Sequence, residues 1–133
     1  MATLGCHEAT TVPIGSMLLV GAFGAEGAEL RADSSHATLE QACLEVTTDV
    51  PIRTNADGRF TLPALRHRTG GAFIAGFPEE PTPVTIDGGA TDGSVRRVTL
   101  MVVTKPASPG APVPPADTFN LAEAVHAVIL GCP

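Results

Sequence analysis

Residues 47–62 contain the pattern that most constrains how this chain can fold. Apolar and β-branched side chains alternate with polar ones on both sides of the segment Asn55-Ala56-Asp57-Gly58. Such alternation is typical of strands with one buried face, and Gly58 can adopt the positive φ that a tight turn needs. The Asp-Gly pair matches a hairpin with a type I turn and a glycine bulge. We therefore expect antiparallel β-structure here, with Asp57, Gly58 and Phe60 as the fold-defining turn residues.

Further strands are expected on both sides of this hairpin, and together they predict a β-sandwich domain over residues 11–104. Residues 36–44 fit either a short helical turn or a loop leading into a strand, because helical spacing and alternation overlap there. Residues 87–93 are mostly turn formers and are expected to be a loop. The remaining expected strands are 16–23, 28–32, 43–48, 72–77, 84–86 and 95–104.

The two ends of the chain differ in character from this domain. Residues 1–10 are expected to form an extended N-terminal arm. Residues 105–116 contain five prolines, which lack the donor for a sheet ladder, and predict a stiff linker. A mostly apolar helix is expected over 117–133, capped by Asp117 or Thr118 and ended by Gly131.

Composition excludes some classes of function. The formal net charge is −6 and there is no basic block, so no nucleic-acid surface is expected. The chain has five Phe but neither Trp nor Tyr, which argues against an antibody-like or sugar-stacking face. No apolar run reaches the roughly 18 residues of a membrane span, and no export signal is recognisable.

The cysteines, Cys6, Cys43 and Cys132, form no Cys-x-x-Cys pair, so neither a zinc site nor a redox motif is expected. Cys43 lies among apolar residues and is interpreted as a small buried side chain. A bridge between Cys6 and Cys132 remains open. The sequence before Cys6 also resembles a bacterial lipoprotein junction, which leaves acylation of Cys6 open as well.

Side chains that could carry chemistry are present but do not form a known pattern. The histidines have no metal spacing, and Asn55-x-Asp57-Gly58 lacks the further acidic ligands of a calcium loop. Glu79 and Glu80 are adjacent on a loop and are expected to be solvated rather than to act as an acid–base pair. Arg96 and Arg97 are expected to make a sheet-face contact. The four histidines that lack metal spacing are His7, His36, His67 and His126. No catalytic, metal or cofactor-binding residue is therefore predicted.

A spaced pattern of turn, apolar and glycine residues runs from the hairpin to the last expected strand of the domain: Thr54, Asp57, Gly58, Arg59, Phe60, Thr61, Leu62, Leu65, Gly71, Phe73, Gly76, Phe77, Val98 and Leu100. By this pattern, about residues 47–103 resemble the carboxypeptidase regulatory-like (transthyretin-like, prealbumin-like) domain. The resemblance implies an all-β fold of about seven antiparallel strands in an immunoglobulin-like or transthyretin-like sandwich. Members of that family are usually non-catalytic modules of secreted, surface or envelope proteins.

These observations predict a non-enzymatic structural or assembly protein that associates with itself or a larger complex through its terminal arms. A virion, filament or envelope assembly is favoured over a cytoplasmic role. The alternatives are a small-ligand or peptide-binding module of the cell envelope, with or without a lipid anchor, and an accessory domain of an enzyme. The apolar face of the expected C-terminal helix supplies the candidate partner-binding residues, Phe119, Leu121, Val125, Val128 and Ile129.

Overall fold

The computed structural model describes residues 12–13, 16–68, 81–104, 109–112, 115–125 and 129. These residues form an all-β structure, as the sequence predicts, and no helix occurs among them. In the same residues no helix is long and apolar enough to cross a membrane. The strands are β1 (Val12–Pro13), β2 (Gly21–Ala25), β3 (Ala28–Ala32), β4 (Ala37–Gln41), β5 (Leu44–Thr47), β6 (Arg59–Arg68), β7 (Thr82–Asp92), β8 (Arg97–Thr104) and β9 (Asp117–Ala122).

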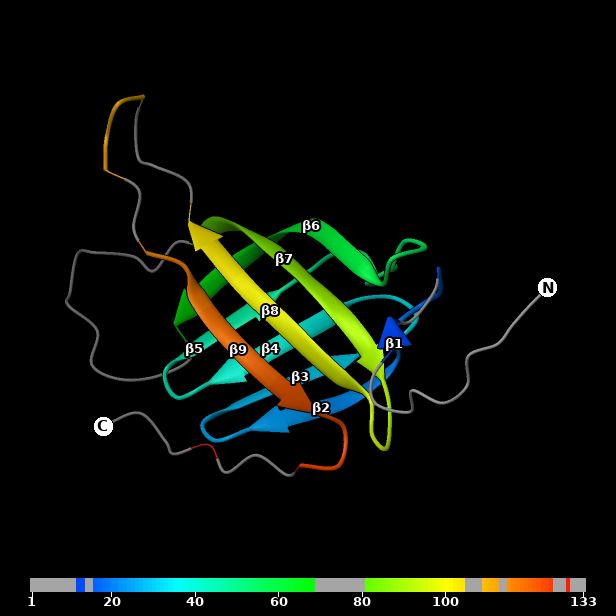
Figure 1. The fold of residues 1–133 in the computed structure, drawn as a ribbon. Coiled ribbons are helices and arrows are strands. Elements are labelled where there is room, and N and C mark those ends of the chain that lie inside the picture. Colours follow the sequence, from blue (N-terminus) through cyan, green and yellow to red (C-terminus); the bar gives the residue numbers. More distant parts are fainter. Residues whose placement is uncertain are drawn as a thin grey trace.

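Strands β2 to β9 form a closed antiparallel barrel (Figure 1). Each strand pairs with the next along the chain, and β9 returns to pair with β2. The pairing around the barrel is uneven. Strands β2 and β3 pair along their full lengths, from Gly21–Ala32 to Ala25–Ala28, whereas β2 and β9 are in register only at Gly24 and Ala122. The β2–β9 seam is therefore the least extensively paired junction of the barrel.

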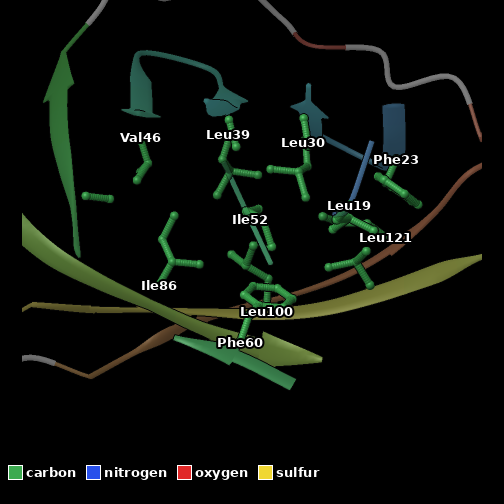
Figure 2. Packing of buried hydrophobic residues seen from close by; sticks show 14 of the residues in the cluster. Leu19, Phe23, Leu30, Leu39, Val46, Ile52, Phe60, Ile86, Leu100 and Leu121 are labelled. Carbon is green, nitrogen blue, oxygen red and sulfur yellow. The ribbon is translucent and has the colours of Figure 1, made fainter. Parts of the chain in front are cut away.

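Alternate side chains of each strand point into the barrel and fill it. Figure 2 shows Phe23, Leu30, Leu39 and Val46 from β2–β5 facing the side chains of β6–β9 across the interior. This filling agrees with geometry, because an eight-stranded barrel has an interior just wide enough for side chains. The other fully buried large side chains are Leu19, Ile52, Val84, Ile86, Val98, Leu100 and Leu121.

A short two-stranded contact outside the barrel strands adds to this core. Leu18 and Arg53 form an isolated antiparallel bridge, and the Leu19 amide donates to the Ile52 carbonyl at 2.9 Å. The bridge places Leu19 and Ile52, both 0% exposed, between the two walls (Figure 2). Thr54 joins the same contact, since its hydroxyl accepts from the Met17 amide at 3.1 Å. Residues 17–20 and 52–54 therefore form a short two-stranded contact whose buried members are Leu19, Ile52 and Thr54.

The predicted sandwich and the predicted C-terminal helix are both wrong for the described residues. The sheet closes on itself, so no pair of separate sheets is formed. Residues Asp117–Ala122 are strand β9, antiparallel to β8 from Arg97–Ala122 to Val102–Asp117. The alternation of Phe119 and Leu121 with Thr118 and Asn120 permits a strand, and pairing with β8 and β2 places the apolar set toward the core. Of the predicted helix, 126–128 and 130–133 lie outside the described residues.

Several strand boundaries also differ from the predictions. Residues 87–92, expected to be a loop, complete the long strand β7, and residues 37–41 form strand β4 rather than a helical turn. The predicted strand 16–23 begins only at Gly21. The predicted strands 28–32, 43–48 and 95–104 correspond to β3, β5 and β8, within one to two residues at each end. The predicted strand 72–77 and the N-terminal arm 1–10 lie outside the described residues.

The hairpin turn is present, but its first arm is not a barrel strand. Gly58 has φ 77°, as expected, and its amide donates to the Asn55 carbonyl at 2.9 Å. The side chain that organises the turn is that of Asn55, not Asp57: its Oδ1 accepts from the amides of Asp57 and Arg59 at 2.8 and 3.0 Å. Phe60 is 5% exposed and joins the core.

Candidate functional site

The rim of the barrel at the β7–β8 connection is where both terminal segments join the body. Strand β1 pairs with the last residues of β7, with Val12 opposite Asp92 and Pro13 opposite Thr91. At the other end of the chain, the Glu123 amide donates to the Arg96 carbonyl at 2.9 Å directly after β9. The segments that precede and follow the barrel therefore meet it within a few residues of one turn (Figure 1).

Arg96 is the side chain that organises this rim. Its Nε donates to Glu123 Oε1 at 3.1 Å, and its Nη2 forms an ion pair with Glu123 Oε2. The same Nη2 donates to the Val20 carbonyl at 2.9 Å, just before β2. The guanidinium also lies over the Phe23 ring, 5.2 Å from its centroid. Arg96 thus joins β2 to the end of β9, across the seam where strand pairing is shortest.

The electrostatics of the pair agree with this role. Hydrogen bonding to Arg96 lowers the pKa of the Glu123 carboxyl, and the bond to Glu123 raises the pKa of Arg96. Both directions stabilise the charged forms. The side chains remain 24% and 39% exposed, so solvent screens much of the attraction. The pair is better viewed as one part of a multiple contact than as a strong isolated salt bridge.

A glycine makes room for this contact. Gly21 has φ 146°, a region that residues with a Cβ rarely adopt, and a Cβ there would lie 2.8 Å from Arg96 Nη2. Gly21 therefore lets the guanidinium approach the start of β2 closely. The sequence predicted only a sheet-face contact for Arg96 and Arg97. The role of Arg96 at the β2–β9 seam depends on which strands are neighbours in the barrel. The local sequence pattern does not reveal that.

The predicted partner-binding residues are not brought together on one surface. Leu121 is 1% exposed and lies in the barrel core, and Phe119 is half-buried against that core. These two face the interior as members of β9, where they help to close the barrel. Val125 is 45% exposed beyond the strand, and Ile129 is partly buried. Val128 lies outside the described residues.

The outer face of β3–β5 is acidic. Glu29, Glu40 and Glu45 are directly opposite one another on adjacent strands, and His67 of β6 continues the row. His67 Nε2 lies 2.9 Å from Glu45 Oε1. A shallow depression of about 310 Å³ lies over this face and is also lined by Arg31. Arg31 bonds Glu29, which relieves part of the repulsion between the carboxylates.

The outer face of β6–β9 lacks a row of carboxylates like that of β3–β5. Threonines alternate along these strands, and exposed Met101 and Leu65 interrupt them. Thr61 donates to Asp87 at 3.0 Å across β6 and β7. A second shallow depression, about 280 Å³, lies over Gly89. The two outer walls thus differ in chemistry, one acidic and one mostly uncharged.

Two of the candidate histidines lie beside the acidic face. His36, at an exposed turn, has its Nδ1 2.9 Å from Ser35 Oγ and lines the same depression as Glu45. His67 contacts Glu45 from β6. His7, His126, Glu79 and Glu80 lie outside the described residues. Within the part of the chain that the structure describes, no group of three or more His, Cys, Asp or Glu could hold a metal ion.

Cys43 differs from its prediction as a small buried side chain. It is only partly buried, has φ 69° in the β4–β5 turn, and is disulfide-bonded. The other two cysteines, Cys6 and Cys132, lie outside the described residues, so a bridge between them stays a prediction.

Comparisons with known proteins leave the family open. No family model, no curated protein and no solved structure matches this chain. The resemblance to the carboxypeptidase regulatory-like domain stays a prediction.

Proposed function

We propose that this chain is a non-enzymatic structural subunit that associates with itself or with a larger complex through its terminal segments. The observation that supports this most is the shared rim: β1 pairs at Asp92, and the end of β9 is held by Arg96. Segments that leave the same rim can engage one partner together. A virion, filament or envelope assembly remains the class of setting that we favour.

The packing of the barrel supports a structural role. Ligand-binding barrels of this size hold a small molecule in an interior that side chains leave open. Here Leu19 and Ile52 occupy the space between the two walls, and both are 0% exposed. In the described part of the chain, buried side-chain polar atoms all have hydrogen-bond partners. Packed side chains thus fill the interior, and a partner would contact the outer surface of the barrel.

A ligand- or peptide-binding module of the cell envelope is the weaker proposal. It would need a recess in which polar groups converge on a ligand. The two depressions described above are shallow and lie on the outer walls. On the acidic wall, Arg31 is already paired with Glu29, and His67 with Glu45.

Light scattering coupled to size-exclusion chromatography tests the proposal. The full chain is expected to show a mass above 13.6 kDa that rises with concentration. A chain limited to residues 12–125 keeps every barrel strand, with β9 and the connection before it, but lacks the segments outside the barrel, and it is expected to associate no further than a dimer. A full chain that stays monomeric at all concentrations would contradict the proposal.

The truncation also removes Cys6 and Cys132, so a matched control for the loss of cysteines is needed. Cys43→Ser in the full chain removes the disulfide and keeps both terminal segments, and its backbone cost at φ 69° is similar. Under the proposal this variant still assembles. If it associates no further than the truncated chain, the disulfide rather than the terminal segments is responsible for the larger assembly.

A further inference from the structure

We infer that β9 is an exchanged strand: in the assembly, β9 of one copy closes the barrel of a second copy. This inference rests on the proposed self-association and names its partner, a second copy of this chain. The element exchanged is Asp117–Ala122, and the acceptor is the gap between β8 and β2.

The connection that precedes β9 is the first reason. Neighbouring antiparallel strands are usually joined by two to five residues. Strands β8 and β9 are such neighbours, with Val102 opposite Asp117, yet residues 105–116 lie between them. Five of these twelve residues are proline. Chains of this composition favour extended conformations of about 3.1 Å per residue, so twelve residues span up to about 37 Å. This reach is far more than a return to the adjacent strand requires.

The way β9 is held is the second reason. Its contacts with the body are one long ladder with β8, one register pair with β2 and the Arg96 contacts. All of them join β9 to residues that precede the connection. A β9 from another copy would therefore make the same contacts, with Leu121 in the same core position. Exchange then loses no native contact, which is the condition under which strand exchange yields dimers.

The outer face of the β8–β9 ladder offers a direct test. Met101 and Thr118 are directly opposite on β8 and β9, and both are exposed. Directly opposed residues have the spacing that a disulfide requires. The variant Met101→Cys/Thr118→Cys, oxidised as the full chain, therefore reports which chain supplies the β9 beside each β8. We expect a disulfide-linked dimer on non-reducing denaturing electrophoresis, which reduction converts to monomer.

A matched control shares one of the two cysteines. Asp87 lies opposite Met101 on the other side, in β7, and β7 and β8 are joined by a four-residue turn. Asp87→Cys/Met101→Cys should therefore link within one chain and run as a monomer. The wild-type chain, oxidised in parallel, sets the background from its native cysteines.

Each outcome decides the question. A 101–118 link within one chain, in a wild-type protein that assembles, overturns strand exchange and leaves the proposed function standing. The same link in a wild-type protein that is monomeric by light scattering overturns both. If the control link forms and the 101–118 link does not, β9 lies beside no β8, and the inference fails.

Discussion

Arg96, in the β7–β8 connection, holds Glu123, the residue that follows β9, through an ion pair and a backbone hydrogen bond. The same guanidinium bonds the Val20 carbonyl and covers the Phe23 ring. One side chain therefore spans the seam at which the first and last strands of the barrel meet. Because β2 and β9 are in register only at Gly24 and Ala122, this contact supplies much of what holds the seam.

Replacing Arg96 should therefore weaken the barrel more than a surface substitution does. Arg96→Gln removes a cation–π contact, a bond to a carbonyl and a partly exposed ion pair. We expect the free energy of unfolding to fall by about 1–3 kcal/mol. Denaturant unfolding measures this. Arg97→Gln, at the exposed first residue of β8, is the matched control and should change it by less than about 0.5 kcal/mol. Equal effects at both positions would contradict the role of Arg96.

Gly88 should not tolerate a side chain, although its neighbour Gly89 should. A Cβ on Gly88 would lie 2.3 Å from the Thr99 carbonyl oxygen and 2.9 Å from Phe60 Cζ. Phe60 is also the register partner of Gly88, so its ring occupies the space that the glycine leaves. Gly88→Ala is expected to cost about 1–3 kcal/mol through overpacking. Gly89→Ala, with its nearest atom at 3.7 Å, should be nearly neutral in the same unfolding experiment.

Ile52 should contribute as a core residue even though it lies outside the barrel strands. Its side chain is 0% exposed between the two walls. Ile52→Ala should lower the free energy of unfolding by about 2–5 kcal/mol. Val50→Ala, in the same loop and 48% exposed, should cost less than about 1 kcal/mol. If the two substitutions cost the same, residues 52–54 do not pack inside the barrel.

The turn after β3 should make stability depend on pH in acid. Hydrogen bonds from the Ser35 amide, the His36 amide and the Ser35 hydroxyl lower the pKa of Asp33 to about 2 from 3.8. Between these values the unfolded chain binds more protons than the folded one, so this stabilisation is lost as pH falls from 3.8 to 2. The stability difference between wild type and Asp33→Asn should shrink over that range. A difference that is constant with pH would contradict the assignment.

Local sequence predicted the all-β class because alternation and turn chemistry are short-range signals. Strand β3 and the Gly58 turn were predicted correctly on such signals. Strand β7 was missed in part because Gly88 and Gly89 resemble a loop. The reason for a glycine at position 88 is the close approach of the Thr99 carbonyl and the Phe60 ring from the two neighbouring strands, which the local pattern does not show.

The C-terminal strand was missed because two signals compete. Phe119 and Leu121 alternate as in a strand, but the alanine-rich residues that follow favour a helix, and the longer pattern dominated the prediction. Which segment fills the gap between β8 and β2 is decided by closure of the barrel, a long-range property. The role of Arg96 depends on the same closure, so the local sequence could not predict it either.

Nuclear Overhauser contacts across β9 test the account most directly. Closure by β9 predicts backbone contacts of Asn120 with Thr99 on one side and of Ala122 with Gly24 on the other. A helix over 117–130 would instead give sequential amide–amide contacts through this segment and none to Gly24. The first result would establish the closed barrel. The second would contradict it, together with the shared rim and the exchange of β9.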